Sequence, residues 1–300
     1  MINKKALIKR DFKFDNFKKD IIELKFLSKV SKKAVFISKK TGLIYHDTSH
    51  IKIEDTLKIW STKIFSKIND AKNNLYNDDI PYVNSRHHYV LDTLRKKISL
   101  KKKNIFYFGF GQGGFLTKIS LSGFKNLTGS EISKKNIILT KNRFRKLKLK
   151  LPNILNSNIE NINIKNKTDI GILSWTLCNC NDPMQVVESL SKNIKKNGYL
   201  IVAESSRILV PFKKSIYNYF LPNKIDNIHP WHFSFNSLNN IFKYYGFELF
   251  YKNKFEEDNN LVLIFKNSKN YKQKIIFDNY RKVISFLKRW VKESNFYKEK

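Results

Sequence analysis

The chain is poor in several residue types, and each shortage excludes a class of protein. It has two cysteines, Cys178 and Cys180, among 300 residues. Two thiols separated by one residue do not build the disulfide framework of a small secreted domain, so we expect a cytoplasmic protein. Six prolines and ten glycines exclude collagen-like and proline-rich low-complexity sequences.

Long apolar runs are also missing. No stretch approaches the roughly 18 consecutive apolar residues of a transmembrane helix, and the first ten residues lack the apolar segment of a signal peptide. Hydrophobic residues still make up 41% of the chain, which is enough to build a core. We therefore expect neither a transmembrane segment nor a signal peptide.

Acidic residues are scarce: 25 Asp and Glu stand against 58 Lys and Arg, a net charge of +33. Such a charge attracts nucleic acid, an anionic membrane surface or an anionic substrate. The lysines, however, are spread over nearly every segment together with abundant Asn, Ile and Phe, all of which have A/T-rich codons. Base composition of the gene explains this pattern, so nucleic acid is a less favoured partner than a small molecule.

The glycines are concentrated at one place. Four of the ten lie between Gly109 and Gly114, after the apolar run 105–108 and before the amphipathic segment 115–121. This pattern predicts a buried strand, a tight turn and the start of a helix, where the backbone can approach a ligand closely. A G-x-G-x-G stretch alone is weakly specific, so its neighbours decide its meaning.

Strands and helices are predicted to alternate around this turn. The predicted strands are 104–108, 126–131, 154–156, 169–174 and 199–204, followed by an antiparallel pair, 247–251 and 261–265. The predicted helices are 85–98, 113–121, 133–149, 183–194 and 236–245, and Asn197-Gly198 is predicted to form a turn. This alternation predicts an α/β fold with a mostly parallel sheet covered on both faces.

Two further segments flank this region. Residues 1–35 are predicted to be a polar, partly helical lead-in. Residues 34–37 and 43–45 are predicted to pair as a hairpin, and residues 53–77 are predicted to form a helix. The basic tail, 272–293, is predicted to be an amphipathic helix, and its apolar stripe consists of Ile276, Tyr280, Val283, Leu287 and Trp290. Core packing is the favoured explanation of this stripe, and peripheral contact with a membrane or a partner is the alternative. We therefore expect an N-terminal extension (1–84), an α/β domain (85–268) and a C-terminal helix (269–300).

Polar residues stand where the parallel strands end, which is where ligands bind in such sheets. Glu131 ends the second strand, 20 positions after Gly111. A carboxylate there can accept hydrogen bonds from both hydroxyls of a ribose. Asn158 and Ile159 follow the third strand and are placed to meet an adenine, and Ser174 and Trp175 end the fourth. These positions predict a site for a nucleoside cofactor, with an ordinary exposed glutamate as the alternative for Glu131.

These stretches resemble the class I S-adenosylmethionine-dependent methyltransferases. Residues 108–113 (FGFGQG), 129–133 (GSEIS) and Asn158 match their cofactor motifs, and 173–183 (LSWTLCNCNDP) aligns without a gap with the family stretch LSHVLEHVPDP. Residues 195–204 look like the segment LKPGGxLhhE, and 229–248 look like the family's H-x-x-x-F-S … GFE ending. The resemblance covers residues 85–266. It implies a Rossmann-like, seven-stranded, mostly parallel sheet with an antiparallel last strand.

The resemblance also implies S-adenosylmethionine as the cofactor. The residues it assigns to cofactor binding are Phe108, Gly109, Gly111, Gln112, Gly113, Glu131, Asn158, Ile159, Ser174 and Trp175. The family usually has an acidic residue just before the first glycine, where this chain has Tyr107 and Phe108. Phe110 and Trp175 are candidates for packing on the cofactor, with core packing as the alternative. Cys178 and Cys180 are expected to line the cleft rather than to bind a metal.

The hairpin residues 42–45 (GLIY) resemble the CGLVY end of a zinc-binding lead-in. That lead-in occurs in sugar C-methyltransferase-like proteins of cell-surface polysaccharide clusters, which implies a nucleotide-linked sugar or a surface-glycan precursor as the methyl acceptor. The cysteine pairs are absent; Ser28/Ser31 and Ser38/Thr41 stand near their places. Because hydroxyls do not replace thiolates at zinc, we expect no metal and a hairpin held by packing alone.

Catalysis by such an enzyme is helped by a base that takes a proton from the acceptor. His229 and His232 follow the fifth strand on the expected substrate side, and Glu204 at the end of that strand is placed to orient one of them. The alternative is that both histidines only hold the loop to the domain. Two other functions stay open: an RNA methyltransferase, and an inactive partner protein that keeps the fold. Residues 174–177 (SWTL) lack the Asn/Asp-Pro-Pro-aromatic turn used on base amino groups.

Overall fold

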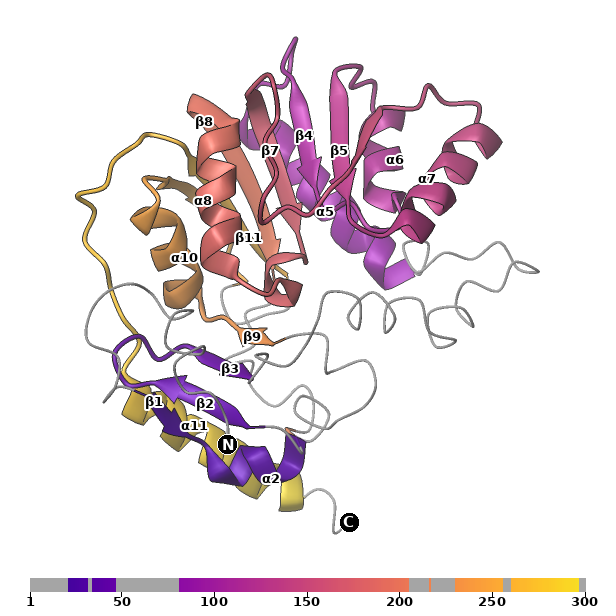
Figure 1. The fold of residues 1–300 in the computed structure, drawn as a ribbon. Coiled ribbons are helices and arrows are strands. Elements are labelled where there is room, and N and C mark those ends of the chain that lie inside the picture. The colour runs from indigo at the N-terminus through magenta and orange to yellow at the C-terminus, as the bar shows by residue number, and fades with distance from the viewer. Residues whose placement is uncertain are drawn as a thin grey trace.

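The computed structural model describes residues 21–31, 34–46, 81–204, 216, 230–255 and 260–296. They include a seven-stranded and a four-stranded sheet (Figure 1). The strand order of the larger sheet is β10-β11-β8-β7-β4-β5-β6. Its strands are β4 (Ile105–Phe108), β5 (Leu127–Glu131), β6 (Asn153–Asn156), β7 (Thr168–Ser174), β8 (Ile194–Glu204), β10 (Glu248–Lys252) and β11 (Leu261–Lys266).

The strand directions confirm the predicted Rossmann-like α/β fold. Strands β4 to β8 run parallel, whereas β11 pairs antiparallel with both β8 and β10. The first of the parallel strands, β4, lies between β5 and β7, so the direction of the chain across the sheet reverses beside it. In open α/β sheets a ligand binds at the carboxyl ends of the strands at such a reversal.

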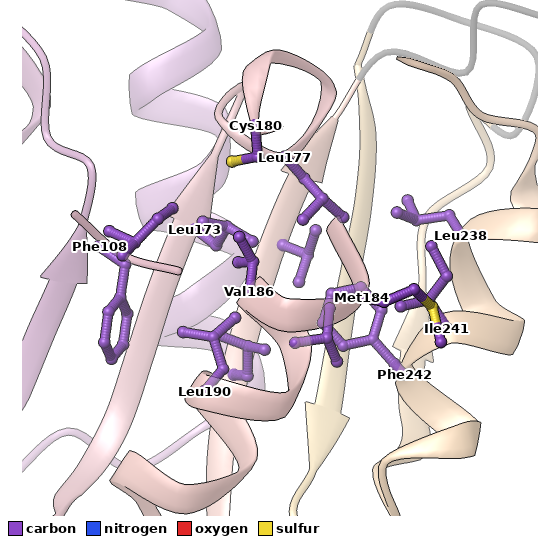
Figure 2. Close-up of a cluster of buried hydrophobic side chains, with 14 of the residues drawn as sticks. Phe108, Leu173, Leu177, Cys180, Met184, Val186, Leu190, Leu238, Ile241 and Phe242 are labelled. Carbon is purple, nitrogen blue, oxygen red and sulfur yellow. The ribbon is translucent and has the colours of Figure 1, made fainter. Parts of the chain in front are cut away.

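Helices cover both faces of this sheet. One face carries α5 (Pro81–Lys97), α6 (Gly114–Leu121) and α7 (Lys134–Lys146), and the other carries α8 (Pro183–Asn193) and α10 (Phe235–Tyr244). The side chains of β4 alternate between these two cores: Phe106 and Phe108 join one, and Ile105 and Tyr107 join the other. Figure 2 shows the first core, where Val186 and Leu190 of α8 lie beside Phe108 and Leu173.

The four-stranded sheet lies below the carboxyl ends of the parallel strands (Figure 1). Its order is β1 (Ile21–Glu23), β2 (Val35–Ser38), β3 (Ile44–His46) and β9 (Trp231–His232), with antiparallel pairing throughout. Two helices accompany it, α2 (Lys25–Ser31) and α11 (Tyr280–Phe296). The predicted hairpin is therefore confirmed, and it gains β9 as a neighbour from a distant part of the sequence.

The small sheet buries both of its faces. Phe36 and Tyr45 pack with Trp231 into the core shared with α8 and α10. The Trp231 Nε1 also donates a hydrogen bond to the Cys180 carbonyl oxygen at 2.8 Å. On the opposite face, Val35, Ile37 and Ile44 form a core with Val283, Leu287 and Trp290 of α11. These last three residues of the predicted stripe are almost fully buried, which confirms core packing as their role.

The tail differs from the prediction in one respect: its helix begins at Tyr280, not at residue 272. Hydrogen bonds to α10 hold the preceding segment outside a helix. Asp278 accepts from Ser234 Oγ and from Asn236 Nδ2, and the Ile276 carbonyl accepts from Asn240 Nδ2. Ile276 consequently lies outside the buried stripe, with 53% of its surface exposed.

Other boundaries also differ. The lead-in, predicted as polar and partly helical, contains the helix α2 and also the strand β1, which was not predicted. The predicted Asn197-Gly198 turn lies inside β8, where Asn197 has a φ of 63° and the pairing with β7 shifts register. The predicted helix 53–77 lies outside the described residues. Among the helices that the structure describes, none has the length and apolar character needed to cross a membrane.

The hairpin is not held by packing alone, which corrects the expectation from the missing cysteines. The buried Ser38 Oγ accepts a hydrogen bond from Thr41 N at 3.1 Å, and Thr41 Oγ1 accepts one from Leu43 N at 3.2 Å. Ser28 Oγ likewise accepts from Val35 N at 3.1 Å. Hydroxyl oxygens thus accept hydrogen bonds from two backbone N–H groups of the turn and from one at the start of β2.

We expect Ser38→Ala to lower the free energy of unfolding by about 1–3 kcal/mol, because the buried Thr41 N–H loses its acceptor. Urea unfolding measures the change. Ser99→Ala, at an exposed position, is the control and should stay within about 0.5 kcal/mol of the wild type. Equal stability of the two variants would show that the Ser38 bond contributes nothing.

Candidate functional site

The glycine turn lies at the carboxyl end of β4, as predicted. Gly113 is the N-terminal cap of α6, with a φ of 80°. Gly111 has a φ of 60°, and a Cβ added there would meet no atom within 4 Å. The turn is fixed from behind, because the N–H groups of Gly109 and Phe110 both donate to the Ser130 carbonyl oxygen at 2.9 and 3.1 Å. Open space therefore lies beside an anchored backbone.

Glu131, at the end of β5, is joined directly to this turn. Its Oε2 accepts a hydrogen bond from Gly111 N at 2.9 Å, and its Oε1 accepts from Ser133 N at 2.9 Å and from Asn136 Nδ2 at 3.4 Å. The side chain is only 7% exposed, which disagrees with an ordinary exposed glutamate. Burial raises the pKa of this carboxyl, and the N–H donors oppose the rise.

The other predicted cofactor residues lie along the same edge of the sheet. The Asn158 side-chain oxygen accepts from Glu160 N at 3.0 Å, and Ile159 is buried in the core. Gln112 is buried within the turn. The Phe108 side chain points into the core beneath β4 rather than toward the edge (Figure 2), so only its backbone borders the turn.

Tyr107 stands where an acidic residue was expected. Its hydroxyl lies 2.5 Å from the Ser174 Oγ at the end of β7, and its ring packs edge-on against Phe115 of α6. The phenol thus joins the carboxyl ends of β4 and β7 through a hydrogen bond between two hydroxyl groups. No charge is available at this position, so the Glu131 carboxylate is the charged group joined to the turn.

Trp175 follows β7 in a left-handed conformation, with a φ of 48°. Hydrogen bonds fix it, since its N–H donates to the Ala203 carbonyl at 2.7 Å and its carbonyl accepts from Asn179 Nδ2 at 3.1 Å. The Arg86 guanidinium lies over its ring at 4.2 Å, and the His87 ring lies 5.9 Å away. Sequence reasoning missed Arg86 and His87 as site residues; their place at the start of a helix before the glycine turn was the available signal.

The structure describes two of the three predicted catalytic residues, His232 and Glu204. His229 lies outside the described residues. His232 lies in β9, is 1% exposed and packs against His46 with ring centroids 5.1 Å apart. Glu204, at the end of β8, is equally buried, and its Oε2 accepts from Cys178 N at 3.2 Å.

Three residues expected near the ligand belong at least in part to the core. The Phe110 ring covers Gly129, where an added Cβ would lie 2.7 Å from Phe110 Cδ1. Cys178 and Cys180, expected to line the cleft, are both buried in the core next to α8. Their thiols contact Asn179 Oδ1 and the Thr176 carbonyl oxygen. In the described part of the chain, no three His, Cys, Asp or Glu side chains gather in a way that could hold a metal ion.

We expect Gly113→Ala to be strongly destabilising. The left-handed conformation costs a non-glycine residue about 1–2 kcal/mol, and overlap with Thr140, whose Oγ1 would lie 2.4 Å from the new Cβ, adds about 1–3 kcal/mol. Gly123→Ala is the matched control, because its φ of 85° is similar but its surroundings are open. Chemical unfolding of both proteins separates the two costs, and equal losses would contradict the predicted overlap.

Comparison with known proteins agrees with this geometry. Residues 106–202 match the family model described as "Methyltransferase domain". A crystal structure of an S-adenosylmethionine-dependent methyltransferase from Clostridium acetobutylicum is 14% identical, covers 68% of this chain and 98% of its own, and superposes with a TM-score of 0.50. The PH0226 protein from Pyrococcus horikoshii is 16% identical, covers 63% of this chain and 93% of its own, and gives a TM-score of 0.52. No curated protein matches the sequence.

At these identities the structural neighbours establish the fold alone, and the family match applies to residues 106–202. That segment contains the glycine turn and Glu131, and it ends within β8. Residues 106–202 therefore match a methyltransferase domain, and the described fold is that of class I S-adenosylmethionine-dependent methyltransferases, in agreement with the enzyme class and the cofactor predicted from the sequence.

Proposed function

We propose that the protein transfers a methyl group from S-adenosylmethionine to a small polar acceptor, specifically a nucleotide-linked sugar or a surface-glycan precursor. The observation that carries the cofactor assignment is the buried Glu131 carboxylate, held beside the open space at Gly111. The acceptor class rests on the resemblance of the Gly42–Tyr45 hairpin to that of sugar C-methyltransferase-like proteins, which supports a role in polysaccharide biosynthesis in the cytoplasm.

The cofactor-binding roles follow from the contacts at the edge of the sheet. Glu131 Oε2 accepts one backbone N–H and keeps a lone pair for a ribose hydroxyl. Oε1 accepts from Ser133 N and, at 3.4 Å, from Asn136 Nδ2, and the second ribose hydroxyl would replace the longer of these two bonds. Asn158 uses its oxygen for Glu160 N, and its Nδ2 is then the donor for a ring nitrogen of adenine. The remaining contacts are proposed to come from the edge residues predicted above: Phe108, Gly109, Gly111, Gln112, Gly113, Ile159, Ser174 and Trp175.

When bound, the cofactor would supply a methyl carbon activated by its sulfonium, with S-adenosylhomocysteine as the leaving group. The residues of this chain must therefore align the acceptor and exclude water. We assign proton acceptance to His229 or His232, and the orientation of the base to Glu204. Unchanged turnover in both His229→Gln and His232→Gln would remove these histidines as bases.

The flanking segments are proposed to act as one cap on the α/β domain. Residues 1–84 and 269–300 flank the domain 85–268, and α2, β2, β3 and α11 within them share one apolar core. The cap faces the carboxyl ends of the parallel strands (Figure 1), and this is the side from which an acceptor would enter. The solvent-facing side of α11 carries Arg281, Lys282, Lys288, Arg289 and Lys292, which suits a peripheral contact with an anionic membrane surface.

Binding of S-adenosylhomocysteine, measured by calorimetry, tests the proposal directly. We expect saturable one-to-one binding, whereas an absence of binding at millimolar ligand would leave only the inactive partner protein. Labelled S-adenosylmethionine then identifies the acceptor. When the protein and labelled S-adenosylmethionine are incubated with separated small-molecule and RNA fractions, we expect the label in the small-molecule fraction. Label in the RNA fraction alone would favour the RNA methyltransferase, which the charge of +33 also suits.

Cofactor affinity should depend on pH through Glu131. The ribose hydroxyls donate to the ionised carboxylate, and burial raises the pKa of this group above that of an ordinary glutamate. Affinity should therefore fall as the pH is lowered through this raised pKa and level off above it. Calorimetry with S-adenosylhomocysteine across acidic pH measures the effect, and a Glu131→Gln protein with the same profile would show that another group titrates.

A further inference from the structure

His87 is a buried imidazole beside the glycine turn that the proposed function leaves without a role. It lies on α5, is 5% exposed, and stacks on Phe115 with ring centroids 5.0 Å apart and planes 6° from parallel. Its Nδ1 is buried and has no hydrogen-bond partner in the described part of the chain. Aromatic contacts therefore hold the ring in place, and a buried polar atom normally has a partner.

Among the residues that the structure describes, the groups that act electrostatically on His87 are basic. They are Arg86, Lys118, Arg143 and His88, and together with burial, the largest cause, they lower the pKa of His87 to about 3. The imidazole is consequently neutral near pH 7, and the positive charge around it comes from arginine and lysine. Lys118 Nζ lies 3.0 Å from His88 Nε2, which ties α6 to α5.

These side chains converge on the glycine turn. Phe115, on which His87 stacks, is two residues after Gly113 at the start of α6. Gly113 also touches Thr140 of α7, one helical turn before the buried Arg143. Trp175, beneath the Arg86 guanidinium, follows the end of β7. Three helices thus bring cations to the region where cofactor and acceptor must meet.

We propose that Arg86, His87, Lys118 and Arg143 bind a phosphate group of the methyl acceptor. This assignment rests on the proposed function and narrows its acceptor class to phosphorylated molecules, such as a sugar joined to a nucleoside diphosphate. Two N–H groups of an arginine guanidinium can donate hydrogen bonds to two oxygens of the same phosphate. The neutral His87 imidazole can donate a further hydrogen bond from Nδ1. A single carboxylate, such as that of the cofactor's amino-acid end, carries one negative charge, whereas a phosphate group carries up to two and offers these donors more oxygens.

An occupied site would change His87 itself. A bound dianion favours the protonated imidazole, so the pKa of His87 should rise from about 3 toward neutral values. Nuclear magnetic resonance of the histidine ring should then show a new titration above pH 5 in the full-length protein. This readout needs neither turnover nor knowledge of the acceptor.

The experiment saturates the protein with S-adenosylhomocysteine and titrates pyrophosphate and uridine diphosphate by calorimetry. Arg86→Gln and Lys118→Gln should each weaken binding of both probes about tenfold or more. Lys146→Gln removes the same charge from an exposed position on α7 and should change binding less than about twofold. Thermal unfolding checks that each variant is folded, and the His87 titration tests the wild type independently.

Several results would overturn the assignment. The first is wild-type protein that binds S-adenosylhomocysteine but neither probe, with no shift at His87. The second is Arg86→Gln weakening S-adenosylhomocysteine while sparing 5′-methylthioadenosine, which lacks the amino-acid end, because the cluster would then hold the cofactor's carboxylate. The third is an RNA oligonucleotide displacing both probes at far lower concentration. Failure to bind S-adenosylhomocysteine would instead refute the proposed function.

Discussion

Glu131→Ala is expected to weaken binding of S-adenosylhomocysteine by about a hundredfold or more. A hydrogen bond to a charged group contributes about 1.5–3 kcal/mol, and the substitution removes the acceptor for both ribose hydroxyls. It also removes the acceptor that orients Gly111 N, so the turn keeps only the bonds from Gly109 N and Phe110 N to the Ser130 carbonyl oxygen of β5. Isothermal calorimetry with the purified full-length protein measures the loss.

The matched control is Glu248→Ala, which removes an exposed carboxylate at the start of β10. It should leave the affinity within about twofold, because an exposed charge far from the site is screened. Circular dichroism shows whether both variants are folded. If Glu131→Ala bound the ligand as tightly as wild type, the ribose assignment would be wrong, whatever the rest of the site does.

Trp290→Ala is expected to lower the free energy of unfolding by about 3–5 kcal/mol, as large-to-small substitutions of buried aromatic residues do. Trp290 is 1% exposed and joins α11 to Val35, Ile37 and Ile44 of the small sheet. The small sheet contacts the α/β domain through Trp231 and Tyr45. Because Trp290 shares its core with α2, β2 and β3, we expect the substitution to destabilise the whole cap. Denaturant unfolding measures it.

Phe296→Ala is the control within the same helix, since 56% of that side chain is exposed. It should cost less than about 0.5 kcal/mol. Hydrogen exchange adds a second readout: Trp290→Ala should raise exchange in β2 and β3 more than in β4 and β7. Similar losses in the two variants would mean that α11 is not anchored by its buried stripe.

The fold and the cofactor edge could be predicted because local signals agreed there. Three short sequence signals were sufficient: the glycines at positions 109–114, a carboxylate at the end of the next strand and the proline at the start of α8. Each of them favours one local structure or contact for a physical reason. The resemblance to the methyltransferases implied an antiparallel last strand, and β11 is that strand. Local pattern was sufficient because these elements are neighbours in sequence and in space.

The parts that were missed depend on contacts between distant residues. The pairing of β9 with β3 joins residues almost 190 positions apart, and no local pattern indicates it. The start of α11 is set by Asp278 and its partners on α10, which override a helical periodicity that began earlier. The position of Arg86 and His87 at the site depends on the packing of α5 beside Trp175, which the sequence does not indicate.

The four-stranded sheet has a consequence for how the chain folds during synthesis. Its hairpin is made early, but β9 comes at residue 231 and the helix that covers Val35, Ile37 and Ile44 ends at residue 296. At roughly 5–20 residues per second, the apolar face of the nascent hairpin waits on the order of ten seconds or more for its cover. The earliest part of the chain is thus among the last to be buried, and over that interval it is a target for chaperones.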